Sequence, residues 1–192
     1  MPDLYITAGC NGAEKTTASR TILPEILNCK EFVNADAIAL GLSPFNPHNA
    51  PFEAGRIMPK IIRQMISEQK DFAFETTLST KSYISFLKFS KEKGYKITLV
   101  YFWLNSKTLA KERVAKRVRL GGHHIPEDMI ERRYDRAICN LFNHFINLSD
   151  QWFIYDNSEE QIRLIADYSD EENLKINNSI ISQQIKDQCK NI

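Results

Sequence analysis

Hydrophobic residues fall into short continuous runs that alternate with longer stretches in which every third or fourth position is apolar. Continuous runs are typical of strands covered on both faces, and the wider spacing is typical of helices with one buried face. The short runs predict strands at Asp3–Ala8, Phe32–Ala35, Phe72–Glu75, Lys96–Leu104 and Trp152–Tyr155. The longer stretches predict helices at Thr16–Leu27, Ala54–Gln69, Lys81–Lys93, Leu109–Leu120 and Glu127–Asn147.

Strands that alternate with helices indicate βαβ units, which place parallel strands in one sheet and helices on both of its faces. We therefore predict an α/β fold with three layers, α/β/α, around a mainly parallel sheet. No internal repeat or break in composition marks a second core. We expect one domain over residues 1–167 and a peripheral tail over residues 168–192.

Two segments depart from this alternation. Residues 43–59 contain Pro44, Pro47, Pro51 and Pro59, and we expect a shaped loop there. Residues 156–173 are strongly acidic, and residues 177–192 are polar with few large apolar side chains. The C-terminal tail is therefore predicted to be a peripheral helix or a frayed end.

Composition excludes several classes of protein. Basic and acidic residues nearly cancel, 25 against 24, so the chain lacks the excess positive charge of a dedicated nucleic-acid binder. The longest strongly apolar run, Ile97–Leu104, is too short to span a bilayer, and no secretory signal is visible at the N-terminus. The 4 cysteines are scattered without a paired spacing. We expect reduced thiols in a cytoplasmic protein without membrane contact.

A phosphate-binding motif follows the first predicted strand. Residues 9–16 read Gly-Cys-Asn-Gly-Ala-Glu-Lys-Thr, close to the G-x-x-x-x-G-K-[ST] pattern, and a predicted helix begins directly after them. In such a loop backbone N–H groups and the helix N-terminus bind phosphate, the lysine reaches the β- and γ-phosphates, and the hydroxyl binds Mg²⁺. The predicted nucleotide-binding residues here are Gly9, Asn11, Gly12, Ala13, Glu14, Lys15, Thr16 and Thr17, with Thr16 as the metal ligand.

Glu14 departs from this motif, which has glycine at that position. A carboxylate about 5 Å from a bound phosphate would cost about 3 kcal/mol at an effective dielectric constant of about 20. The cost is smaller if the side chain turns outward, and pairing with Lys15 would occupy the phosphate ligand. Two alternatives therefore stay open: a loop with impaired nucleotide binding, and a tight turn that binds no nucleotide.

Two carboxylates lie at predicted strand ends. Asp36 follows the second strand and Glu75 ends the third, and ligands of open parallel sheets bind beyond the carboxyl ends of the strands. We predict Asp36 as the base that accepts a proton from an acceptor hydroxyl. Glu75, with Thr76 and Thr77, is predicted to bind substrate or to position metal-bound water. Alternatively, Asp36 caps the following turn and Glu75 is a solvated strand end.

A basic segment precedes a pair of glycines. Residues 107–119 carry six lysines and arginines, Gly121 and Gly122 follow, and the next helix brings more arginines. Such a segment is typical of a lid that closes over a triphosphate, because arginines neutralise charge on the transferring phosphoryl group. The candidates beside the glycines are Arg117, Arg119, Arg132 and Arg133. A solvated helix face is the alternative, and we prefer it for Lys107, Lys111 and Lys116.

With these motifs in order, the chain resembles the zeta-toxin-like group of P-loop kinases. The resemblance covers about residues 3–157. It rests on Ala8–Thr17, Phe32–Asp36, Gly41–Pro44, Glu53–Arg56, Phe74–Ser79, Gly121–His123, Ile125–Glu127, Arg132–Tyr134 and Tyr155–Asn157.

The resemblance implies a five-stranded P-loop kinase fold with a helical lid. It also implies a kinase that uses Mg²⁺ and ATP or GTP to phosphorylate UDP-N-acetylglucosamine at the amino-sugar 3-hydroxyl, a toxin restrained by an antitoxin protein. By position, Lys15 is the phosphate-loop lysine, Asp36 the base, and Arg117 and Arg133 the catalytic arginines, with Arg119 and Arg132 as alternatives. Related kinases act on antibiotics, nucleotides or polynucleotide ends, so another small-molecule acceptor is an alternative, as is a nucleotide-poor scaffold that works through protein contacts.

Overall fold

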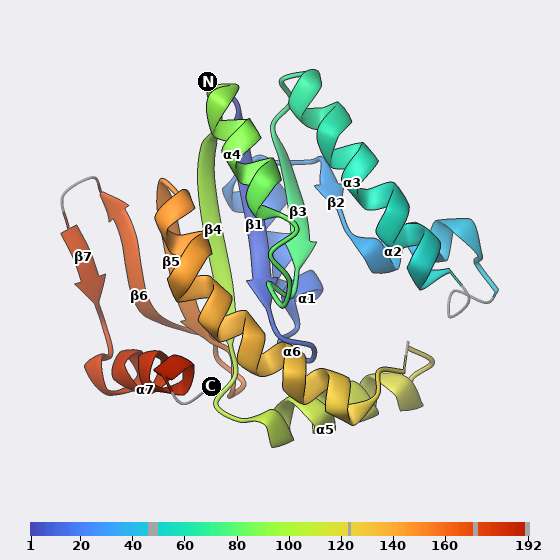
Figure 1. Cartoon of the computed structure of the whole chain (residues 1–192). Helices are drawn as coiled ribbons and strands as arrows, with labels where there is room; N and C mark the ends of the chain where they lie inside the picture. Colours follow the sequence, from blue (N-terminus) through green and yellow to red (C-terminus); the bar gives the residue numbers. More distant parts are fainter. Residues whose placement is uncertain (46–49, 123, 171–172, 191–192) are drawn as a thin grey trace.

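The computed structural model describes residues 1–45, 50–122, 124–170 and 173–190. Over these residues the chain forms a seven-stranded sheet in the order β2-β3-β1-β4-β5-β6-β7 (Figure 1). The strands are β1 (Asp3–Gly9), β2 (Phe32–Val33), β3 (Phe72–Thr76), β4 (Lys96–Trp103), β5 (Gln151–Asp156), β6 (Arg163–Asp170) and β7 (Asn173–Ile176). The first five pair in parallel, and β6 and β7 join antiparallel. The predicted α/β class is confirmed. The sheet has two strands, β6 and β7, beyond the five that we expected.

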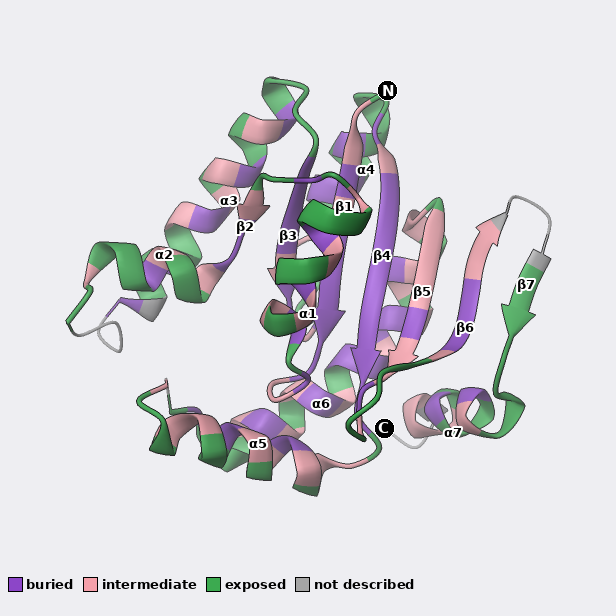
Figure 2. Cartoon of the chain, turned by 180° about the vertical axis from the view of Figure 1, so that it is seen from behind, coloured by how far each residue is buried: buried purple, intermediate pink, exposed green. Residues whose placement is uncertain are grey.

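Helices cover both faces of this sheet. They are α1 (Lys15–Thr21), α2 (Ala35–Leu42), α3 (Pro51–Ser67), α4 (Ile84–Glu92), α5 (Lys107–Arg119), α6 (Glu127–Asn140) and α7 (Ser179–Lys190). One π-helical turn, Ile22–Ile26, extends α1, and π and 3₁₀ turns over residues 141–148 extend α6. Helix α4 and the α6 segment cross one face, and α1 lies on the other (Figures 1 and 2). None of the helices described is long and apolar enough to cross a membrane.

The core lies along β3, β1 and β4, which Figure 2 shows as almost continuously buried. Large side chains on both faces of these strands, such as Ile6, Phe74 and Phe102, are fully buried. Two-sided burial explains why these strands appear in the sequence as continuous apolar runs, since neither face of the strand reaches water.

Helix α3 corrects the proline-rich loop that we expected over residues 43–59. The helix begins at Pro51, where the missing N–H costs nothing in the first turn, and it continues through Pro59. Ala54, Met58 and Ile62 are at most 2% exposed and form its buried face, so core packing outweighs the one backbone bond lost at Pro59. Residues 46–49 of the expected loop and His123 lie outside the described residues.

The acidic segment and the tail form two strands of the sheet and a helix that packs beside it. Tyr168 pairs with Trp152 of β5, so the boundary expected between residues 167 and 168 falls inside β6. Helix α7 packs on α6 and buries Ile185, while Gln188 accepts a hydrogen bond from the Trp103 indole at 3.1 Å. The expected peripheral tail thus contains the end of β6, strand β7 and a docked helix within its described residues.

The sheet has a topological switch point at β1. In the sheet, β3 lies on one side of β1 and β4 lies on the other. The connections after β1 and β3 therefore start at the carboxyl ends of the strands and turn to opposite faces of the sheet. Ligands of open parallel sheets bind in the crevice at such a point. In sheet order, the segment that follows β3 lies between the loop after β1 and the segment after β2. This arrangement places the motif residues of all three connections at one edge.

Candidate active site

The phosphate loop joins β1 to α1 and is packed tightly against the neighbouring elements. Gly9 has φ +147°, and a Cβ there would lie 2.3 Å from the Phe102 carbonyl oxygen of β4. Gly12 has φ +82°, and a Cβ there would lie 2.7 Å from the Ala110 carbonyl oxygen of α5. Both positions therefore require glycine, because any side chain would collide with the backbone of β4 or α5.

Two residues that sequence reasoning did not place in the site support this loop from outside. The Asn157 side-chain amide donates to the Ala13 carbonyl oxygen at 2.9 Å, and both residues are buried. Arg113 donates to the carbonyl oxygens of Asn157 and Ser158 at 2.8 and 3.1 Å. Asn157 could have been predicted from the sequence, because it is a polar residue directly after β5 and so lies at the same ends of the strands as the loop.

The structure brings Lys15, Thr16 and Glu75 together. The Lys15 ammonium donates to the Cys10 carbonyl oxygen at 3.0 Å and lies 3.8 Å from a Glu75 carboxylate oxygen. The Thr16 hydroxyl donates to the other Glu75 oxygen at 2.6 Å. Parallel pairing of Thr7 with Glu75 produces this contact, because it sets the end of β3 beside the start of the loop. The side chains of Lys15 and Glu75 are only 7% and 13% exposed, so Glu75 is not a solvated strand end.

The Cys10 thiol lies inside the loop without adding charge to it. It is 2% exposed, and burial raises the pKa of Cys10 to about 11. The group is therefore a neutral thiol near pH 7 and does not repel an anionic ligand.

Glu14 is in the left-handed region, with φ 53° and ψ 30°, and its side chain is exposed. This conformation costs a non-glycine residue about 1–2 kcal/mol, which explains why the motif has glycine here. Lys15 contacts Glu75 and Cys10, so the pairing of Glu14 with Lys15 that we considered is not formed. The outward carboxylate is screened by water, so it repels a bound phosphate by less than the about 3 kcal/mol expected for a carboxylate that faces the phosphate.

Two substitutions of Glu14 separate charge from backbone strain. We expect Glu14→Gln to raise ATP affinity about fivefold, because an exposed carboxylate a few ångströms from a phosphate repels it by about 1 kcal/mol. We expect Glu14→Gly to raise affinity similarly and also to raise the melting temperature by about 2–4 °C, since glycine relieves the strain. Calorimetric titration with a non-hydrolysable ATP analogue and thermal denaturation measure the two effects. Equal affinity in wild type and Glu14→Gln would contradict the electrostatic part.

The arginines of α5 and α6 approach the loop unequally. The Arg133 guanidinium of α6 lies 3.4 Å from the Asn11 amide oxygen of the phosphate loop. Burial and the neighbouring Arg132 lower the pKa of Arg133, and the Asp36 carboxylate opposes this effect. Arg133 is thus a partly buried cation over the loop that an anion would stabilise. Arg119 and Arg132 are exposed.

Asp36 lies in the first turn of α2, after β2 has ended at Val33. Asp36 was expected at the end of a strand, but it lies in a short helix instead. The cap of that helix is Asn34, whose side chain accepts a hydrogen bond from the Ala37 N–H at 3.0 Å. The exposed Asp36 carboxylate lies 3.8 Å from the Arg117 guanidinium of α5. The Asp36–Arg117 contact spans the crevice from α2 to the lid.

The glycine pair ends α5, and the missing side chain of Gly122 makes room for the Arg117 side chain. The Gly121 and Gly122 N–H groups donate to the Val118 and Arg117 carbonyl oxygens at 2.9 Å. A Cβ on Gly122 would lie 2.5 Å from Cγ of Arg117. Lys107 and Lys111 form ion pairs with the α6 residues Asp135 and Glu131 at 2.7 and 2.8 Å, so they join the two lid helices rather than forming the solvated face that we preferred.

The turn after β3 uses the hydroxyl groups that were predicted to bind substrate. Thr76 accepts from the Leu78 N–H at 3.1 Å, and the Thr77 and Ser79 hydroxyls share a hydrogen bond of 2.8 Å. Leu78 itself is fully buried with φ 54°. The left-handed backbone costs Leu78 about 1–2 kcal/mol, so surrounding contacts must hold this turn.

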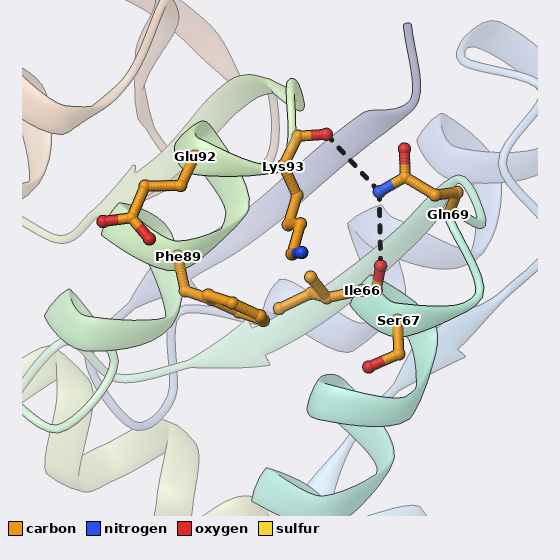
Figure 3. Close-up of a pocket in the computed structure, with 6 residues that line it drawn as sticks. All are labelled: Ile66, Ser67, Gln69, Phe89, Glu92 and Lys93. Carbon is orange, nitrogen blue, oxygen red and sulfur yellow. Dashed lines mark hydrogen bonds between the residues drawn. The ribbon is translucent and has the colours of Figure 1, made fainter.

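A separate hollow of about 460 Å³ lies between the C-terminal ends of α3 and α4 (Figure 3). Its lining includes Phe89 and Lys93, and the Gln69 amide bridges the Ile66 and Lys93 carbonyl oxygens at 3.4 Å. The hollow lies beyond the amino ends of the strands, opposite the phosphate loop (Figure 1). It therefore has no part in the site described above.

The fold and site define a class of protein. A strand, a glycine-containing phosphate loop with Lys15 and Thr16, and a basic helical lid are the elements of P-loop kinases. Residues 47–166 match the family model described as Zeta toxin. The chain belongs to the zeta toxin family.

Similar proteins agree with this assignment. An uncharacterized protein of Haemophilus influenzae is 33% identical over 126 residues, which cover 66% of this chain and 88% of that protein. A crystal structure of the AvrRxo1-ORF1:AvrRxo1-ORF2 complex with sulphate ions contains a chain of similar fold, with a TM-score of 0.77 and 15% identity. The match covers 96% of this chain and 63% of the AvrRxo1 chain, so this chain spans less than two thirds of it.

Two further solved structures share the fold. The AvrRxo1 complex has also been determined with ATP, and its match has a TM-score of 0.76 and 15% identity over 96% of this chain and 63% of that one. A chain of the PezAT chromosomal toxin-antitoxin system of Streptococcus pneumoniae matches with a TM-score of 0.64 and 16% identity, over 99% of this chain and 84% of that one.

Proposed function

We propose that the protein transfers the γ-phosphoryl group of ATP to the amino-sugar 3-hydroxyl of UDP-N-acetylglucosamine. The observation that carries the proposal is the contact of Lys15 and Thr16 with Glu75, below the Arg133 cation that reaches the same loop through Asn11. These groups suit a bound triphosphate, whose charge they would neutralise. Membership of the zeta toxin family supports ATP-dependent phosphoryl transfer, and the ATP-containing AvrRxo1 structure supports ATP as donor.

Sheet order supports the position of the acceptor. The phosphate loop follows β1, Asp36 follows β2, and the end of β3 lies between them. An acceptor hydroxyl must lie between the γ-phosphate and its base, and hence over the end of β3. In the proposed step Asp36 accepts the hydroxyl proton while the oxygen forms a bond to the γ-phosphorus. The bond from that phosphorus to the bridging oxygen breaks, and ADP leaves.

The residues at the loop fit a magnesium ion. The Thr16 hydroxyl and the Glu75 carboxylate lie 2.6 Å apart and provide the oxygen ligands that Mg²⁺ takes. We propose Thr16 as a direct ligand and Glu75 as a ligand through water. The cation, when bound, would neutralise charge on the β- and γ-phosphates. Arg117 and Arg133 would neutralise charge from the lid side, and contact with Arg117 would orient the Asp36 carboxylate.

We further propose a cytoplasmic protein with an antitoxin partner. The likeness to a chain of the PezAT toxin-antitoxin system supports such a partner. All four cysteines are free thiols, which suits a reducing compartment.

Incubation with Mg²⁺, ATP and UDP-N-acetylglucosamine tests the function. We expect a phosphorylated nucleotide sugar and an equal amount of ADP, detected by mass spectrometry and phosphorus NMR. UDP-N-acetylmuramic acid, whose 3-oxygen is blocked by an ether, is the matched control and should remain unmodified. ATP binding without product from any UDP-sugar would refute the acceptor.

A further inference from the structure

The most unusual backbone near the site is at Leu78, three residues after Glu75. Four non-glycine residues with positive φ are described, and Leu78 is the buried one among them. A buried leucine gains nothing locally from the left-handed conformation, because its side chain cannot replace a turn hydrogen bond. Something outside the turn must therefore hold it, and strain held in this way often accompanies a functional site.

Asn140 of α6 holds this turn. Its side-chain amide donates to the Leu78 carbonyl oxygen at 2.6 Å, and the two residues are 8% and 0% exposed. On the other side of the residue, the Leu78 N–H donates to the Thr76 hydroxyl. Both polar groups of Leu78 are thus satisfied by side chains, in a place where neither could otherwise reach water.

Helix α6 connects this turn to the phosphate loop. Arg133, at the middle of the helix, contacts Asn11, and Asn140, at its end, contacts Leu78. Directly after Arg133, the buried Tyr134 hydroxyl donates to the Leu104 carbonyl oxygen at 2.6 Å. Because α6 is fixed at its middle and its end, it sets the distance between the phosphate side and the end of β3, where the acceptor is placed.

We propose that Asn140 is a positioning residue for the acceptor side of this active site, an inference that rests on the proposed function. Its amide fixes the conformation of the turn that follows Glu75 at the end of β3. The same contact sets the floor on which the acceptor lies between the phosphate loop and Asp36. Asn140 touches neither nucleotide nor acceptor and acts through Leu78.

Two substitutions of Asn140 test this role. Asn140→Leu and Asn140→Asp both remove the N–H donor, and we expect each to lower kcat/KM for UDP-N-acetylglucosamine about tenfold to a hundredfold, as small displacements of a reacting group do. Affinity for a non-hydrolysable ATP analogue should stay unchanged. Asn143→Leu, an exposed asparagine one turn further along, is the matched control and should behave as wild type.

A pH profile distinguishes positioning from packing. In the Asn140→Asp variant, the introduced carboxyl group can donate a hydrogen bond to the Leu78 carbonyl oxygen only when it is protonated. The activity of this variant relative to wild type should therefore rise as the pH falls from about 8 to about 6. Asn140→Leu should show no such recovery. Unchanged kcat/KM in both variants, or an equal loss of nucleotide affinity, would overturn the proposal.

Hydrogen exchange separates this inference from the proposed acceptor. If wild type phosphorylates no UDP-sugar, the proposed function fails, but amide exchange at residues 77–79 still reports on the turn. We expect faster exchange there in Asn140→Leu, with the phosphate-loop amides unchanged. Exchange at residues 77–79 equal to that of wild type would show that Asn140 does not hold the turn.

Discussion

Replacement of Asp36 by asparagine is expected to lower kcat by about 10²–10⁴-fold while nucleotide affinity stays unchanged. The asparagine side chain has nearly the same shape but cannot accept the acceptor proton. Asp36 is exposed in the first turn of α2, and its contact with Arg117 is 3.8 Å long, so the substitution removes no buried packing. The loss should therefore fall on the transfer step.

Steady-state kinetics and calorimetric titration of a non-hydrolysable ATP analogue measure the two quantities. Asp128→Asn is the matched control, because Asp128 is likewise an exposed acid in the first turn of a helix. It should leave kcat unchanged. Full activity of Asp36→Asn would remove Asp36 as the base, and an equal loss of nucleotide affinity would instead assign it to the nucleotide site.

Replacement of Lys15 by methionine is expected to lower kcat by about 10²–10³-fold and to weaken nucleotide binding as well. The Lys15 side chain is 7% exposed, and its ammonium is held by the Cys10 carbonyl oxygen and Glu75. Methionine preserves the length of the side chain but has no charge to neutralise the phosphates. The change also leaves Glu75 without its cation, which should reduce the free energy of unfolding by about 1–3 kcal/mol.

The double variant Lys15→Met with Glu75→Gln separates these effects. It removes the unpaired carboxylate, so stability should return toward wild type while activity stays lost. Denaturant unfolding gives the stabilities, and nucleotide titration gives the affinities. Recovery of activity in the double variant would mean that Lys15 serves only to neutralise Glu75.

Strands β1, β3 and β4 could be predicted because they are buried on both faces. Strands β6 and β7 could not, since Asp167, Ser169 and Lys175 interrupt the apolar residues of an antiparallel pair near the sheet edge. Most of helix α3 was predicted from its apolar spacing, but its first turn was assigned to a loop because Pro51 opens it. Proline ends a helix when it lies in the interior and favours one at the first position, so a cluster of prolines does not show which case applies.

The site divides in a similar way. Lys15 and Thr16 belong to a local motif, and Glu75 occupies a strand end, so position along the chain was enough to suggest them. Asn140 and Arg113 act on backbone carbonyl groups that are distant in sequence. Every residue has a carbonyl group, so the sequence contains no sign of which one will be bound.

The order of the sheet also bears on synthesis of the protein at the ribosome. Strand β1 emerges first but lies in the middle of the sheet, where Leu4 pairs with Phe72 and Ile97. A growing chain must therefore keep an apolar strand without neighbours until those residues appear. The phosphate loop is completed later still, because its Ala13 carbonyl group accepts a hydrogen bond from Asn157. A nascent chain that ends before Asn157 lacks a completed phosphate loop, so the loop reaches its final form only after β5 has been made.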